Sequence, residues 1–228
     1  MISAAEIVDR VGKQLATAAS ELATTKPLVA EAMRAQSYEV FLSDPTSART
    51  GGVYFCGLKP YGAKGRSYPV AKVPPTGFML YRDTPSGSPF YPRAKQVIRY
   101  ALDLTLGEEA LLEAALCTNW YFQRAADTAQ LKQFGLDRLD VSSVHQELIT
   151  ELKPTVILCA GNGPVSAYAG ILTLLRLDTT HQEKYLGNSY LRVAQRDGSP
   201  LVVGLPHLSR YPVELQAEEL IAKYLNQL

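Results

Sequence analysis

The chain has 228 residues, of which 46% are hydrophobic and 20% are charged, and its formal net charge is +1. This is the composition of an ordinary globular protein, long enough to bury a full core as one α/β domain or two small ones. Its three cysteines, Cys56, Cys117 and Cys159, lie in apolar stretches and form no C-x-x-C pair, which excludes the usual zinc patterns. No secretory signal follows Met1 and no apolar run could span a bilayer, so we expect a cytoplasmic protein.

Residues 3–42 show the apolar spacing of helices. Ser3 and Glu6 fit a capping box at the start of this segment, which predicts that a helix begins there. The polar stretch 43–52 follows and introduces the first strand. We therefore expect residues 1–50 to form a helical segment that packs on the rest of the domain.

Short apolar runs that end at glycine, proline or asparagine predict the strands. These runs are Val53–Cys56, Leu116–Asn119, Thr155–Ala160 and the pair Tyr190–Ala194 and Leu201–Gly204. Helical spacing predicts helices over 93–106, 141–152, from Pro164 to Leu175, and over 214–228, and we expect a loop over 181–190. The alternation of strands and helices predicts one α/β domain over 1–228, with a mostly parallel central sheet and helices on both faces.

Polar and aromatic side chains follow the predicted strand ends, where open α/β sheets bind their ligands. Lys59 and Tyr61 follow the first strand, and Asn119 ends the second. His207 follows the last strand, with Ser209 and Arg210 just beyond it. An asparagine amide can read a planar heterocycle, a neutral histidine can stabilise a developing oxyanion, and aromatic rings can stack on a base. Together these residue types favour an extruded nucleobase over a metal or a sugar.

Four segments in order resemble the motifs of the uracil-DNA glycosylase superfamily. They are Gly57-Leu58-Lys59-Pro60-Tyr61-Gly62; Gly77-Phe78-Met79-Leu80 with the Pro/Ser-rich loop 84–89; Leu116-Cys117-Thr118-Asn119; and His207-Leu208-Ser209-Arg210-Tyr211. The resemblance covers most of the chain from Val53 to Tyr211. It implies a three-layer α/β/α sandwich and an enzyme that flips a base and cleaves its N-glycosidic bond without a cofactor.

The resemblance also implies roles for individual residues. His207 would stabilise the departing base, with Lys59 and Asn119 as the other catalytic positions. The base pocket would comprise Gly57, Leu58, Pro60, Tyr61, Phe78 and Asn119. The DNA contacts would come from Ser86, Ser88, Ser209, Arg210, Lys64 and Arg66, with Arg210 as the wedge. We expect DNA as the partner of a monomer, without a membrane or a metal cluster.

Two departures from the superfamily pattern leave alternatives open. Lys59 stands where many members have an acid or amide that positions the water, and Leu208 replaces the proline of His-Pro-Ser. A cation beside an oxocarbenium ion is unfavourable. Lys59 could instead pair with Asp83, contact a phosphate or a modified base, act as an amine nucleophile, or be a solvated loop residue. We expect a glycosylase that removes a damaged or modified base, either uracil or a modified pyrimidine such as a hydroxymethylated or glucosylated cytosine in foreign DNA. The alternative is an inactive protein of the same fold that binds nucleic acid or nucleotides. A small-molecule hydrolase is disfavoured by the lack of a nucleophile elbow.

Overall fold

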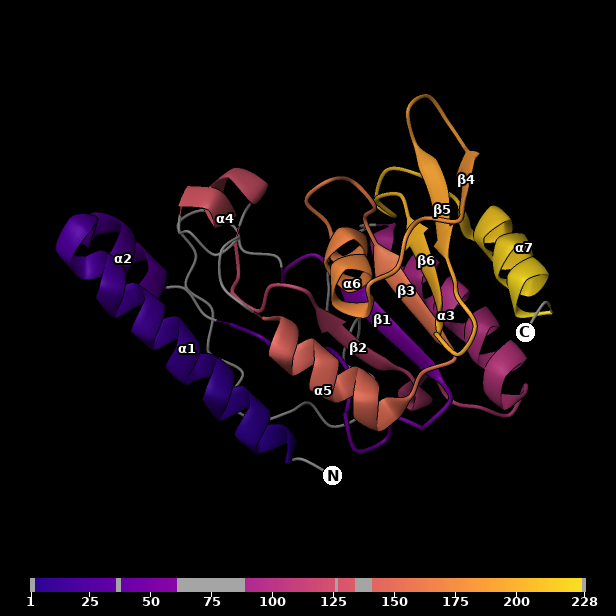
Figure 1. The fold of residues 1–228 in the computed structure, drawn as a ribbon, viewed down its shortest axis with the longest axis horizontal. Helices are drawn as coiled ribbons and strands as arrows, with labels where there is room; N and C mark the ends of the chain where they lie inside the picture. The colour runs from indigo at the N-terminus through magenta and orange to yellow at the C-terminus, as the bar shows by residue number, and fades with distance from the viewer. Residues whose placement is uncertain (1–2, 36–37, 61–88, 126, 134–140, 227–228) are drawn as a thin grey trace.

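The computed structural model describes residues 3–35, 38–60, 89–125, 127–133 and 141–226. A six-stranded sheet lies between helices (Figure 1). Its strands are β1 (Val53–Gly57), β2 (Leu116–Asn119), β3 (Val156–Ala160), β4 (His181–Lys184), β5 (Tyr190–Ala194) and β6 (Leu201–Leu205). The helices are α1 (Ala4–Thr25), α2 (Pro27–Ala35), α3 (Phe90–Leu106), α4 (Thr128–Gln133), α5 (Ser142–Leu152), α6 (Ala167–Leu175) and α7 (Glu214–Leu225), with a 3₁₀ turn, η2 (Leu112–Ala114), before β2.

The strand order in the sheet is β2-β1-β3-β6-β5-β4. The first four strands in this order are parallel, whereas β5 is antiparallel to β6 and β4 is antiparallel to β5. The chain leaves β1 for β2 on one side and returns to β3 on the other. Loops after β1 and β3 therefore leave the sheet in opposite directions, which is the arrangement that opens a ligand crevice at the carboxyl ends of parallel strands.

Each face of the sheet carries its own core, because successive side chains of a strand point to opposite faces. Phe55 and Leu158 pack among buried residues of α3 and α7, and Tyr54 and Ile157 among buried residues of α5 and α6. In Figure 1, α5 and α6 lie in front of the sheet and α3 lies behind it. The predicted three-layer α/β architecture is thus confirmed.

The N-terminal helices extend the molecule beyond the β2 side of the sheet (Figure 1). The predicted capping box is present, since Ser3 and Glu6 bond each other's backbone at the start of α1. Ile7, Val8 and Val11 of α1 are buried in the same core as Tyr54. None of the helices in the described parts of the chain is long and apolar enough to cross a membrane.

The segment after α2 covers the outer edge of β2. Phe41 forms a bridge with Thr118, and the Leu42 N–H donates to the Cys117 carbonyl (2.8 Å). The buried Ser43 hydroxyl donates to the Ala115 carbonyl (3.0 Å) and accepts from the Cys117 N–H (2.8 Å). Backbone groups at this edge are therefore paired within the chain.

Several predicted boundaries are wrong, and α3, for example, begins at Phe90 rather than at residue 93. Residues 181–184 form the edge strand β4 rather than a loop, because a strand paired on one side and exposed on its faces needs no apolar residues. Helix α6 begins at Ala167, not at Pro164. Ser166 is its N-cap, and its hydroxyl accepts a hydrogen bond from the Ala169 N–H (3.2 Å).

Candidate functional site

The carboxyl ends of β2, β1, β3 and β6 lie in one row at the same edge of the sheet, since these strands are parallel. The segments after β1 and β2 run side by side beyond the strands. The Trp120 N–H donates to the Gly57 carbonyl (2.8 Å), and the Tyr121 N–H donates to the Leu58 carbonyl (2.9 Å). Further out, the Ala125 N–H donates to the Pro60 carbonyl (3.4 Å). These bonds hold residues 57–60 of the first predicted motif against the segment that follows Asn119.

Asn119 pairs in register with Gly57, and its side chain covers this glycine. A Cβ atom at position 57 would lie 2.4 Å from the Asn119 Oδ1, so only glycine leaves room for the amide. The side chain is buried, and its Nδ2 has no hydrogen-bond partner among the described residues. A buried donor without a partner costs about 1–3 kcal/mol. Asn119 can therefore gain stabilisation by donating to a ligand.

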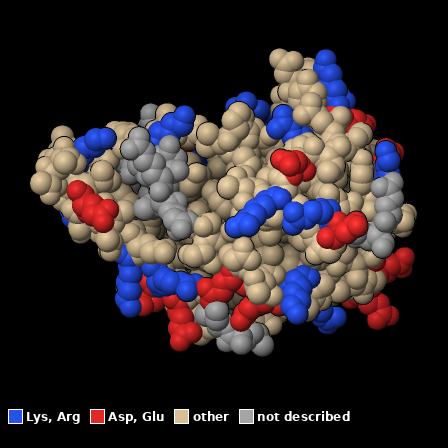
Figure 2. Space-filling view, in the orientation of Figure 1, with Lys and Arg blue, Asp and Glu red and all other residues tan. Residues whose placement is uncertain are grey.

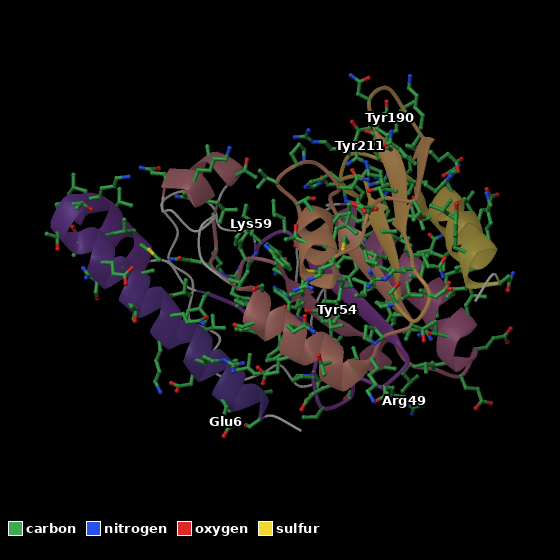
Figure 3. All side chains as sticks on the ribbon, viewed as in Figure 1. Glu6, Arg49, Tyr54, Lys59, Tyr190 and Tyr211 are labelled. Atoms are coloured by element: carbon green, nitrogen blue, oxygen red, sulfur yellow. The ribbon has the colours of Figure 1, made fainter. Side chains whose placement is uncertain are left out.

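Lys59 lies beyond the end of β1 and is half-buried (Figure 3). Its ammonium donates to the carbonyl of Ala125, which ties the loop after β1 to the loop after β2. Burial lowers the pKa of Lys59, and the negative charge of Asp127 partly opposes this effect. The side chain thus turns toward the neighbouring loop, where it offers a partly desolvated cation.

His207 follows β6, and its partly exposed ring lies beside the ring of Phe90 at the start of α3 (centroids 6.0 Å apart). The Ser209 hydroxyl lies 2.7 Å from the His207 Nδ1, and the Ser209 backbone N–H donates to the same nitrogen (3.4 Å). A backbone N–H can only donate, so Nδ1 carries a lone pair and the proton of the neutral ring is on Nε2. Nε2–H is then a hydrogen-bond donor for a ligand.

Partial burial is the main cause that lowers the pKa of His207. The charges of Arg210 and Lys59 lower it further, while the residue's own backbone carbonyl opposes them. Burial and the two positive charges all disfavour the protonated ring, so the imidazole is neutral near pH 7.

Asn119 and His207 lie on the same side of the sheet. Asn119 and Cys117 are two residues apart in β2, so their side chains point to the same face, and Cys117 belongs to the core that α3 and α7 cover. The His207 ring lies beside Phe90 in the first turn of α3, which covers this same face. The described candidate residues at this edge are Gly57, Leu58, Lys59, Pro60, Asn119, His207, Ser209 and Arg210. Tyr61, Lys64, Arg66, Phe78, Ser86 and Ser88 lie outside the described residues.

Asn162, which follows β3 at this edge, was not among the predicted site residues. Its Nδ2 donates to the carbonyls of Tyr190 (2.5 Å) and Gly204 (2.9 Å), and its own carbonyl accepts from Arg192 (2.8 Å). It therefore supports the β5–β6 pair beside the site. Its position between two glycines, directly after the clearest strand, is the signal that could have found it.

His145 supports the site from the opposite face. Its Nδ1 accepts from the Tyr54 hydroxyl (2.7 Å), and its Nε2 donates to the Trp120 carbonyl (3.0 Å). The ring is fully buried and stacks on Trp120 (centroids 4.5 Å apart). Burial lowers the pKa of His145 to about 4, although the Trp120 carbonyl opposes this shift. The structure thus makes this histidine a neutral bridge between β1 and the segment after β2.

Among the described residues, a cavity, the metal-ligating side chains and the surface charge add no residue to the candidate site. A cavity of about 410 Å³ lies between α1 and residues 121–123, on the α5 side. No group of three or more metal-ligating side chains is found among the described residues. Basic and acidic side chains are interspersed on the face seen in Figure 2.

Comparison with protein-family models, with curated proteins and with solved structures finds no match. The assignment to the uracil-DNA glycosylase superfamily therefore rests on the four sequence motifs, and it stays a proposal.

Proposed function

We propose that this protein is a DNA glycosylase that flips a base to the carboxyl edge of the sheet and hydrolyses its N-glycosidic bond. The observation that carries the proposal is the pair of Ser209 contacts with the His207 Nδ1, which places the proton of the neutral ring on Nε2, at the carboxyl edge of the sheet. A departing pyrimidine takes the electron pair of the broken bond and accumulates negative charge on its carbonyl oxygen. A fixed, uncharged donor can stabilise that oxygen without first giving up a proton.

Asn119 is the proposed reader of the base. Its Nδ2 is a buried donor without a partner in the described chain, and its Oδ1 lies over Gly57. A flipped pyrimidine offers a carbonyl to such a donor, and this contact would recover the free energy that the buried amide lacks. Asn119 is held in the β1–β2 pairing opposite Gly57, so its amide is in place before the base arrives. Binding of the base therefore costs less conformational entropy.

The remaining residues divide between the base and the DNA backbone. Phe78 would stack on the base, and Ser86, Ser88 and Ser209 would contact phosphates together with Lys64 and Arg66. Arg210, which is exposed directly beyond His207, would occupy the space that the base leaves. Flipping costs a few kcal/mol, which stacking, amide contacts and the wedge would offset.

Lys59 favours a modified pyrimidine over plain uracil. The residue carries positive charge where many superfamily members position the attacking water, and its amine is bonded to the Ala125 carbonyl. An ammonium here suits a hydroxylated or glycosylated substituent, or a phosphate, as an acceptor. The same cation also favours the second candidate function, a protein that binds such DNA without cleaving it.

The test is a panel of duplexes that each carry one modified or damaged base, scored for abasic sites in single-turnover reactions. At least one duplex should be cleaved, and His207→Ala should slow cleavage about a hundredfold or more while leaving binding nearly intact. His181→Ala is the matched control, because His181 lies in β4 and packs beside Tyr224. Binding without cleavage across the panel would favour the second candidate, and no binding at low salt would overturn both.

A further inference from the structure

The hairpin formed by β4 and β5 places its turn at the same edge of the sheet as the candidate site. Lys184 pairs with Tyr190 at the turn, and Arg192 pairs with Gly204 near the carboxyl end of β6. The turn closes through hydrogen bonds from the Tyr185 N–H to the Ser189 carbonyl and from the Ser189 N–H to the Leu186 carbonyl (2.9 Å each). In Figure 1 the hairpin rises above the neighbouring strands.

The hairpin is braced against the loop that carries His207. The Tyr185 hydroxyl donates to the Pro212 carbonyl (2.6 Å), and the Tyr185 ring meets the Tyr211 ring edge to face (centroids 6.5 Å apart). Tyr211 is itself tied to the His207 carbonyl through its N–H (3.2 Å). The turn and the His207 loop therefore form one wall.

The tip of this wall combines an apolar side chain with cations. Leu186 is 58% exposed, and the adjacent Gly187 has a φ of +58°, which lets the chain turn sharply. Lys184 at one side of the tip and Arg210 in the braced loop are both exposed. Exposed cations attract phosphates, and apolar side chains of this size can enter between base steps and unstack them.

We propose that Leu186 is a second, apolar wedge that enters duplex DNA between base steps beside the flipped base, while Arg210 occupies the space that the base leaves and Lys184 contacts the flanking backbone. The inference rests on the proposed function and deepens it, because it names double-stranded DNA as the partner. A wedge acts only where bases are stacked and paired, so its contribution belongs to the duplex and is absent from a single strand.

The experiment compares Leu186→Ala with Leu111→Ala. Leu111 is 66% exposed and lies between α3 and β2, at the opposite edge of the sheet. Each variant is titrated at low salt with one duplex that carries 2-aminopurine next to a modified pyrimidine, and with the matching single strand. Far-UV circular dichroism checks that both variants stay folded.

Leu186→Ala should weaken duplex binding about tenfold, as expected for one lost unstacking contact. It should also reduce the rise in 2-aminopurine fluorescence and leave single-strand binding unchanged, and Leu111→Ala should match the wild type. The Leu186 wedge is overturned, and the proposed function stands, if the wild type binds the duplex and Leu186→Ala binds it equally well. The same conclusion follows if Leu186→Ala loses affinity for the duplex and the single strand to the same extent. Self-association that Leu186→Ala abolishes would identify the tip as a contact between copies instead. A wild type that binds no duplex would remove the proposed function together with the wedge.

Discussion

The guanidinium of Arg93 donates a hydrogen bond of 2.8 Å to the carbonyl oxygen of Leu208. Its Nε also forms an ion pair with Glu214 at the start of α7 (3.1 Å). One side chain on α3 thus joins the loop after β6 to the start of α7, and Phe90 from the same turn of α3 lies against the His207 ring. The orientation of His207 therefore depends on a helix that is far from it in sequence.

Replacing Arg93 with methionine should loosen this loop while preserving most of the packing of α3. The pKa of His207 should rise toward its ordinary value, because the ring would become better solvated. The titration is followed by NMR on the His207 ring, which needs no substrate. Gln96→Ala is the control, since Gln96 on the same helix bonds Glu218 of α7 and not the loop. An unchanged His207 titration in Arg93→Met would show that the loop does not need this anchor.

A methyl group at position 57 should disturb Asn119. The Cβ of Gly57→Ala would lie 2.4 Å from the Asn119 Oδ1, so the amide must move. Overpacking of this kind costs roughly 1–3 kcal/mol of unfolding free energy. Gly163→Ala is the matched control, because nothing lies within 4 Å of its added methyl group. Urea unfolding measures both, and base-specific binding should fall only in Gly57→Ala. Equal stability of the two variants would mean that Asn119 does not occupy the observed position.

Lys59 should act through contact and not as a nucleophile. Burial lowers the pKa of its amine, but the Asp127 charge opposes the loss of the proton, and the ammonium is engaged by the Ala125 carbonyl. We therefore expect no borohydride-trapped DNA adduct. Lys59→Met should weaken binding and reduce the slope of log affinity against log salt by about 1, as for one lost phosphate contact.

Lys132→Ala is the control for Lys59, because Lys132 is an exposed cation on α4. An adduct that forms in the wild type and is lost in Lys59→Met would prove the contact role wrong. Unchanged binding and salt dependence in Lys59→Met would make the residue a bystander.

Acid should destabilise the fold through His145. Its pKa in the folded protein is about 4, against an ordinary value of 6.5, so the unfolded chain takes up the proton first as the pH falls. Above pH 6.5 His145 does not change the free energy of unfolding. As the pH falls from 6.5 to 4, its titration lowers the free energy of unfolding by roughly 3 kcal/mol at most. Urea midpoints measured across this range should decline less steeply in His145→Gln than in His181→Gln. Parallel declines would show that His145 is not the group that titrates.

The strands under the candidate site were predictable because their residues are apolar on both faces. Val53–Gly57 and Val156–Ala160 are buried throughout, so the runs themselves identify them. β4 was missed for the opposite reason. Its residues are polar, and it is a strand only because β5 offers it a partner. Edge pairing depends on distant segments, and local periodicity does not encode it.

The candidate site was predictable in its residue types but not in its contacts. The motifs locate Lys59, Asn119 and His207 at strand ends. The register that sets Asn119 over Gly57 follows from the pairing of β1 with β2, which lie about sixty residues apart along the chain. The bond from Lys59 to the Ala125 carbonyl likewise arises only when two loops meet. Such contacts belong to the tertiary fold.

A strip of three residues pairs along the outer edge of β2 and affects how the chain folds without aggregating. It consists of Phe41, Leu42 and Ser43. Without it, β2 would present open carbonyl and amide groups to solvent, and such an edge recruits strands from other molecules. The strip is synthesised before β2, so it must remain available until residue 119 has emerged. A chain shortened past residue 43 would keep every strand of the sheet and still be prone to aggregate.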